Sequence, residues 1–232
     1  MIEPKIVYED NHIIVVIKPH NIAVQADSSN DPDMLTIIKD FIKVRDNKLG
    51  NVFLGLVHRL DRPTGGVMVF AKTSKAASRL SAELKAKAMK KKYICVVCGR
   101  PKIIENRLTT YLKKDEKNNL VYIAPQTEQG SKEAILDYKL IATKNKLSLM
   151  DIDLITGRSH QIRVQMAKQL NLPIYADFKY GDKEHVGNLA LWAYELKFVH
   201  PVTKENMKFK VAPDYKNSAF SFFENDIDKL IN

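Results

Sequence analysis

The distribution of apolar residues along the chain predicts many short strands. Residues 6–17 hold two apolar stretches about a polar turn at Glu9-Asp10-Asn11, which is typical of two paired strands. The continuous apolar run Val67–Ala71 predicts a buried strand. Further strands are predicted at residues 93–98 and in two pairs, 134–142 with 147–155 and 191–200 with 207–211.

Helical spacing of apolar residues is found in fewer places. Leu35, Ile38, Phe41 and Ile42 predict a helix over residues 34–44. Thr73 or Ser74 can cap a second helix to about Met89, with a buried stripe of Ala77, Leu80, Leu84 and Ala88. Ser159 can cap a third, with Ile162, Met166 and Leu170 on one face, and residues 220–231 predict an acidic amphipathic helix. Residues 101–134 are polar and predict an irregular segment with an exposed hairpin tip at 113–119.

Length and charge narrow the possible functions. A chain of 232 residues can bury one substantial core. Its 37 Lys and Arg against 27 Asp and Glu give a net charge of +10, which favours a polyanionic partner, nucleic acid before an anionic membrane surface. The longest apolar run near the start, Ile13–Ile17, is far too short to span a membrane. We therefore expect a soluble, cytoplasmic protein without membrane contact.

The two cysteines, Cys95 and Cys98, do not predict a disulfide framework. They form a Cys-x-x-Cys inside the predicted strand 93–98, where residues three apart point to opposite faces. They cannot both bind one metal ion there, and no second pair of cysteines completes a zinc site. We interpret both as small core residues and expect no metal.

The stretch Val57–Lys72 has the strongest candidate chemistry. Asp61 lies just before a turn that Pro63, Gly65 and Gly66 favour, ahead of the predicted strand 67–71. Arg59 and Arg62 are possible counter-ions. On local chemistry alone a structural role for Asp61 and a catalytic one both stay open.

The residue patterns of this stretch and of three later stretches resemble known motifs. His58-Arg59-Leu60-Asp61-x-x-Thr64-x-Gly66 resembles the signature of the RluA-type pseudouridine synthases. Lys92–Gly99 resembles the family's Lys-x-Tyr-x-x-x-Val-x-Gly strand, Gly157–Val164 its Gly-Arg-x-His-Gln-Ile-Arg motif, and residues 171–181 its Pro-Ile-x-Gly-Asp-x-x-Tyr-Gly segment. The resemblance implies that Asp61 is catalytic, that Tyr93 lies beside the target base and that Arg163 pairs with Asp61.

Some positions depart from the family pattern. Asn21 stands where the family's Lys-Pro-x-Gly has its glycine, and asparagine is the next most tolerant residue of a left-handed turn. Gly65, Gln165 and Ala176 replace the family's Ser, His and Gly. These changes bear on substrate contacts rather than on the reaction class. We interpret Lys18 and His20 as ordinary polar loop residues.

The family resemblance implies an RNA isomerase that needs no cofactor. The target nucleotide has to be flipped out of structured RNA, ribosomal or transfer RNA, before the reaction. Candidate residues that contact RNA or substrate are His58, Arg59, Arg62, Thr64, Lys90, Lys91, Lys92, Arg158, His160, Gln161 and Ile174. Basic side chains among them can hold phosphates. The sequence does not choose between Asp61 as nucleophile and Asp61 as base.

The resemblance also implies the architecture. It is α+β, the pseudouridine synthase fold: a single domain with a long mixed, mainly antiparallel sheet flanked by helices and a central active-site cleft. We expect one catalytic domain over residues 1–232, with its core at about 6–211 and a helical tail at about 215–232. The chain resembles the short form without an S4 domain, and we expect a monomer with no obligatory protein partner.

Two rival functions follow from the same residues. One is a non-catalytic RNA-binding protein on the same scaffold, although pure binding needs no buried acid facing a polyanion. The other is a hydrolase that uses His58 and Asp61, which lacks a paired second carboxylate or metal ligands at suitable spacing.

Overall fold

The computed structural model describes residues 3–27, 29–216 and 218–232. The chain divides into two compact units. The first unit is Met1–Lys90 with Ala193–Val211, and the second is Lys91–Trp192 with Ala212–Asn232. The prediction of one domain over the whole chain stays a prediction.

The first unit contains the strands that surround the Asp61 motif. They are β1 (Lys5–Glu9), β2 (Ile13–Lys18), β3 (Gly55–Leu56), β4 (Gly65–Ala71), most of β10 (Leu191–Val199) and β11 (Asn206–Lys210). Their order is β1-β2-β4-β10, with β3 also on β4 and β11 on β10. The pairs β1–β2, β2–β4, β3–β4 and β10–β11 are antiparallel. Every residue of β4 is buried, which confirms the predicted buried strand.

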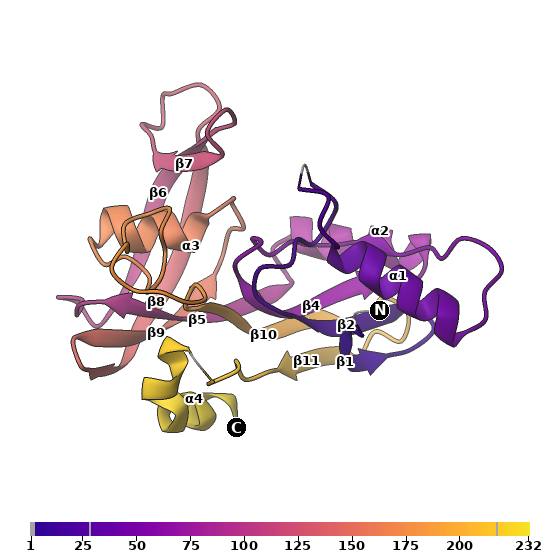
Figure 1. The fold of residues 1–232 in the computed structure, drawn as a ribbon. Coiled ribbons are helices and arrows are strands. Elements are labelled where there is room, and N and C mark those ends of the chain that lie inside the picture. The colour runs from indigo at the N-terminus through magenta and orange to yellow at the C-terminus, as the bar shows by residue number, and fades with distance from the viewer. Residues whose placement is uncertain (1–2, 28, 217) are drawn as a thin grey trace. The chain divides into compact units, whose positions relative to one another are not determined.

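Two helices lie on one side of these strands (Figure 1). The helix α1 (Met34–Arg45) is capped by Asp33, whose side chain accepts from the Thr36 amide, and it confirms the prediction. The helix α2 (Ser74–Lys85) is capped by Thr73 as predicted, but it ends four residues before Met89. The backbone of Lys87 turns left-handed with φ 58°, so Ala88 is exposed instead of completing the buried stripe.

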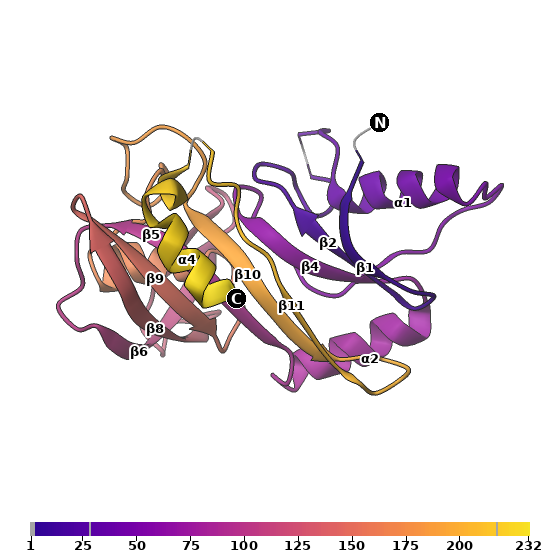
Figure 2. The ribbon, with the colours of Figure 1, turned by 90° about the horizontal axis from the view of Figure 1, so that it is seen from below.

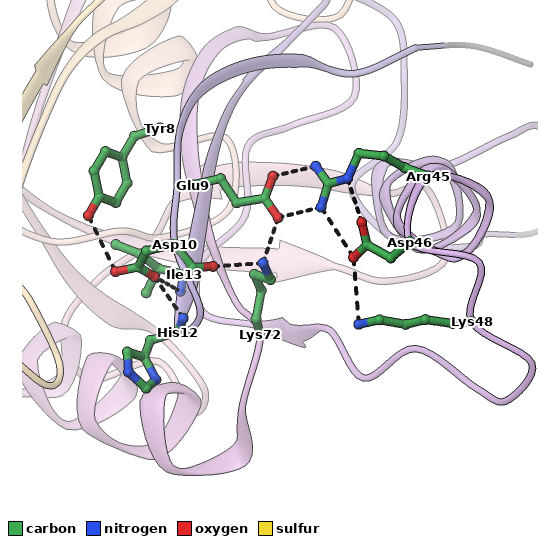
Figure 3. Close-up of polar contacts among 9 residues, drawn as sticks. All are labelled: Tyr8, Glu9, Asp10, His12, Ile13, Arg45, Asp46, Lys48 and Lys72. Atoms are coloured by element: carbon green, nitrogen blue, oxygen red, sulfur yellow. Dashed lines mark hydrogen bonds and ion pairs between the residues drawn. The ribbon is translucent and has the colours of Figure 1, made fainter.

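A network of ion pairs fastens α1 to the strands of its unit (Figure 3). Arg45 at the end of α1 donates to both carboxylate oxygens of Glu9 in β1, at 2.6 and 2.9 Å. Lys72, directly after β4, donates to the same carboxylate at 2.5 Å. The hydrogen bond from Arg45, with Lys72 beside it, lowers the pKa of Glu9. Because these groups are partly exposed, the network orients α1 more than it stabilises the fold.

The second unit is built on five antiparallel strands. Their order is β5 (Lys90–Cys98), β9 (Leu147–Leu154), β8 (Lys132–Lys144), β6 (Glu105–Asp115) and β7 (Leu120–Ile123). Figure 2 shows β5, β9, β8 and β6 from below. The neighbouring pairs are all antiparallel. The prediction that residues 101–134 are irregular is wrong, because β6 and β7 form there. Only Leu108 and Leu112 of β6 are buried, so the polar majority hides the strand pattern.

Helical segments complete this unit. The short helix α3 (Gln161–Val164) continues as a π-helical turn over Gln165–Gln169. The prediction that Ser159 caps this helix is wrong. His160 occupies the N-cap position with φ 50° and makes no side-chain capping bond. The predicted tail helix forms as a 3-10 turn, Ala219–Phe223, followed by α4 (Glu224–Ile231), and it buries Phe220, Phe223 and Ile227. Among the described residues, no helix is long and apolar enough to cross a membrane.

Candidate active site

Asp61 lies on a tight turn between buried segments of the first unit. The Thr64 amide donates to the Asp61 carbonyl oxygen at 2.9 Å and closes the turn. Leu60 before the acid and Thr64 after it are buried, while Asp61 itself is partly exposed. The predicted turn after Asp61 is therefore confirmed.

Two residues at the end of β2 and just after it bind the backbone of this turn. Lys18 is fully buried, and its Nζ donates to the carbonyl oxygens of Pro19 and Arg62, both at 2.9 Å. His20 Nδ1 lies 2.7 Å from the carbonyl oxygen of Pro63. Burial lowers the pKa of Lys18 to about 7, although the nearby Asp61 opposes this shift. The interpretation of Lys18 and His20 as ordinary loop residues is thus wrong, because both bind the backbone of the Asp61 turn.

Two other motif residues bind protein groups in this unit. The Arg62 guanidinium donates to Ser29 Oγ at 2.9 Å and to the carbonyl oxygen of Asn21 at 3.3 Å, and it pairs with Asp27 and Asp31. Arg62 therefore fastens the loop that follows β2. His58 is buried, and its Nε2 accepts from the Val69 amide at 3.2 Å, so this nitrogen cannot act as a hydrolytic base.

The remaining motif residues of this unit differ in exposure. Arg59 is exposed, and so is Lys90. Thr64 is buried, and its hydroxyl has no hydrogen-bond partner within the part of the chain that the structure describes. Asn21 adopts φ 64°, which confirms the left-handed turn at the family's glycine position.

Tyr93 is a buried residue of β5, opposite Ile152 of β9. Its neighbour Lys92 forms an ion pair with Asp151 at 2.9 Å. Lys91 lies against Gly157, and burial lowers the pKa of its amine. Two of the three predicted phosphate-binding lysines are therefore partly enclosed by protein.

Arg163 is held rigidly inside the second unit. Its Nε and Nη2 donate to the two carboxylate oxygens of Asp177, at 2.9 and 2.7 Å, and both side chains are buried. Its guanidinium carbon lies 5.0 Å from the centre of the Tyr180 ring. The Tyr180 hydroxyl lies 2.6 Å from His160 Nδ1 and accepts from the Val121 amide at 2.9 Å. A buried, bidentate and stacked arginine has a single orientation.

The residues around Arg163 also have internal roles. Gln161 Oε1 accepts from the Thr156 hydroxyl and the Arg158 amide, and its Nε2 donates to the carbonyl oxygen of Ile135. Arg158 is exposed, and its Nε donates to the carbonyl oxygen of Glu133. Ile174 is fully buried and bridges Val97.

Sequence reasoning missed Asp177 and Lys18 as site residues. Asp177 belongs to the family-like segment 171–181, so the resemblance carried a signal for it. Ala176 before it adopts φ 60°, which explains why the family has glycine there. The predicted pairing of Asp61 with Arg163 and Tyr93 joins residues of different units and stays a prediction.

Comparisons with known proteins agree with the motifs. Residues 12–168 match the model of the RNA pseudouridylate synthase family. The chain is 34% identical over 222 residues to ribosomal large subunit pseudouridine synthase C of Buchnera aphidicola subsp. Baizongia pistaciae, covering 90% of this chain and 67% of that protein. It is 32% identical to an uncharacterized RNA pseudouridine synthase of Helicobacter pylori, covering 90% and 66%. The chain thus spans about two thirds of the length of these relatives.

Solved structures show the same fold. Human RNA pseudouridylate synthase domain containing 4 superimposes with a TM-score of 0.76 at 20% identity, over 97% of this chain and 92% of that one. Human RNA pseudouridylate synthase domain containing 1 superimposes with a TM-score of 0.73 at 17% identity, over 97% of this chain and 95% of that chain. These matches confirm the predicted fold class. The chain belongs to the RNA pseudouridylate synthase family, and to the RluA type that its motifs predict.

Proposed function

We propose that this chain converts uridine to pseudouridine in RNA with Asp61 as the catalytic carboxylate. The observation that supports this most is the construction of the Asp61 turn. Lys18 and His20 bind the carbonyl oxygens of Arg62 and Pro63, the two residues after Asp61, and Asp61 is partly exposed. A reacting group has to be held still and be reachable, and a partly exposed acid on a turn fixed at two backbone points meets both requirements.

The reaction needs little beyond a placed carboxylate. The bond between uracil N1 and ribose C1′ breaks, the base turns, and C5 bonds to C1′ while the C5 proton leaves and N1 gains one. Asp61 has to be charged to attack C1′ or to remove a ribose proton. Lys18 lies close enough to Asp61 for the two groups to interact, since Asp61 opposes the lowering of the Lys18 pKa by burial.

Tyr93 and Arg163 complete the proposed chemistry. Stacking of the flipped uracil on Tyr93 returns ~1–3 kcal/mol of the cost of unstacking it. We propose that Arg163, which Asp177 binds through Nε and Nη2, pairs with Asp61 in the reaction. Asp177 thereby orients the arginine, as a neighbouring carboxylate orients other catalytic side chains.

The substrate is structured RNA. Because a relative at 34% identity is named for the ribosomal large subunit, we infer that large-subunit ribosomal RNA is the first candidate and transfer RNA the second. Exposed Arg59 and Lys90 would bind phosphates around the target. We further infer a cytoplasmic monomer that needs no protein partner.

Release of tritium from RNA labelled at uracil C5 tests this function. The chain should release tritium from a large-subunit transcript, and Asp61→Asn should reduce release to background because the carboxylate charge is lost. Asp40→Asn is the matched control, since Asp40 is an exposed acid of α1 in the same unit. Full activity of Asp61→Asn would overturn the assignment, and free uracil or strand cleavage would favour the hydrolase.

A further inference from the structure

Three side chains with metal-binding atoms meet in the second unit, and none of them belongs to the proposed catalytic set of Asp61, Tyr93 and Arg163. Cys98 ends β5, and Asp182 and His185 belong to the loop that follows Gly181. Cys98 Sγ lies 3.6 Å from Asp182 Oδ2 and 3.9 Å from His185 Nδ1. His185 Nδ1 lies 3.0 Å from both oxygens of Asp182.

These separations match those around a tetrahedral zinc ion. Bonds of about 2.3 Å to sulfur and about 2.0–2.1 Å to nitrogen and oxygen place neighbouring ligand atoms about 3.3–3.6 Å apart. The three observed distances lie within about 0.4 Å of that range. Thiolate, imidazole and carboxylate together are a donor set that zinc accepts.

A catalytic Cys-His-Asp arrangement does not explain the cluster. Such an arrangement places the thiol at one ring nitrogen and the carboxylate at the other. Here both groups approach the same nitrogen, Nδ1 of His185. Three donors that converge on one point are arranged to chelate a cation rather than to relay a proton.

The surrounding groups orient the donors. Asp182 is 4% exposed, and its oxygens accept from the amides of Ala176 at 2.6 Å and Glu184 at 3.2 Å. The Tyr175 ring lies 4.2 Å from the His185 ring and tilts against it by 35°. The side chain of His185 is 35% exposed, so solvent reaches this member of the cluster. Metal ligands in proteins are commonly oriented by such outer contacts.

We propose that Cys98, Asp182 and His185 bind a divalent zinc ion, with water as the fourth ligand. The ion ties the end of β5, the strand that carries Tyr93, to a loop more than 80 residues later in the chain. Cys95 is fully buried and lies outside the cluster of three, so it takes no part. The expectation of no metal considered only the two cysteines, and therefore missed ligands from a distant loop.

Cobalt(II) substitution tests the site directly. The full chain, without an affinity tag and stripped of metal, is titrated with Co²⁺ while its absorbance is recorded, and bound Zn²⁺ is then counted after gel filtration. We expect one equivalent, a thiolate-to-cobalt band in the near ultraviolet, and a higher Tm with Zn²⁺. Cys98→Ser should abolish the band and weaken Zn²⁺ binding at least roughly tenfold, whereas Cys95→Ala should keep both.

The controls separate ligand loss from misfolding. The metal-free Cys98→Ser variant should have the circular dichroism and Tm of the metal-free parent. His185→Gln, on a partly exposed loop, should weaken binding in the same way even if Cys98→Ser folds poorly. Absence of a thiolate band in the parent, or an unchanged band in Cys98→Ser, would overturn the proposal. The readout is metal binding, so either outcome leaves the proposed RNA reaction untouched.

Discussion

At the scale of single residues, Lys18 makes the least expected contribution. A lysine rarely lies fully buried, because taking its charge out of water is costly. Here the amine donates to two carbonyl oxygens and lies near Asp61, so part of that cost is offset. The same contacts hold the turn that carries the proposed catalytic acid.

The titration of Lys18 should be visible in the stability of the protein. Burial lowers its pKa from 10.5 to about 7 in the folded state. Between these values the unfolded chain binds more protons, so the contribution of Lys18 to stability grows as pH rises. Relative to Lys18→Met, the free energy of unfolding of the parent should gain about 2 kcal/mol from about pH 7 to about pH 9. Urea unfolding at both pH values measures this difference.

An exposed lysine provides the comparison. Lys43→Met, on the outer face of α1, removes the same charge from the same unit without touching the Asp61 turn. The difference in the free energy of unfolding between Lys43→Met and the parent should not change with pH over this range. Equal pH dependence of the parent and Lys18→Met would show that Lys18 keeps an ordinary pKa when folded.

At the scale of elements, β4 depends on one glycine. Gly66 adopts φ +132°, and a Cβ there would lie 2.3 Å from the carbonyl oxygen of Ala193 and 2.5 Å from its amide nitrogen. Both contacts are with backbone, which cannot move aside without disturbing β10. Gly66→Ala should therefore lower the free energy of unfolding by about 3 kcal/mol or more, measured by urea unfolding.

Gly130→Ala separates backbone strain from steric overlap as causes of the expected loss of stability. Gly130 also has a positive φ, +85°, but a Cβ there would meet nothing within 4 Å. Only backbone strain applies, so the expected loss is about 1–2 kcal/mol. Equal losses for the two variants would contradict the steric account of Gly66.

Helices and strands with a clear local pattern of apolar and turn residues could be predicted from the sequence. β1, β2, α1 and the pair β8–β9 follow from local apolar patterns and turn residues, and they form close to the expected positions. β6 could not be predicted, because it buries only Leu108 and Leu112 and its pairing with β8 lies well beyond any local pattern. The prediction of where α2 ends was wrong for a similar reason, because Lys90 is part of the strand β5.

The candidate site divides in the same way. Asp61, Tyr93 and Arg163 were found because each lies in a long motif with a family resemblance. Lys18 and Asp177 act through contacts with Arg62 and Arg163, 44 and 14 residues away. Such contacts form only in the folded chain, so local spacing does not reveal them, although the family-like segment 171–181 carried a signal for Asp177.

At the scale of the whole molecule, the net charge of +10 has to act on RNA through particular lysines. The basic run from Lys85 to Lys92 has several roles in the structure. Only Lys85 lies in the last turn of α2, where the helix dipole explains a cation. Lys91 and Lys92 are partly enclosed, whereas Lys87 and Lys90 are exposed. These two are therefore the exposed lysines of the run that the helix dipole does not explain, and we infer that they bind phosphates.

Salt dependence of binding tests this assignment. If Lys87 and Lys90 each neutralise one phosphate, replacing both with glutamine should reduce the slope of log affinity against log salt by about 1–2. Binding to a labelled large-subunit transcript measures the slope, and the turnover of saturated enzyme should be unchanged because neither lysine belongs to the proposed catalytic set of Asp61, Tyr93 and Arg163. Replacing Lys5 and Lys43, equally exposed in the same unit, removes the same charge and should change the slope by less than one. Equal changes for both pairs would mean that RNA responds to total charge, and that Lys87 and Lys90 form no specific phosphate site.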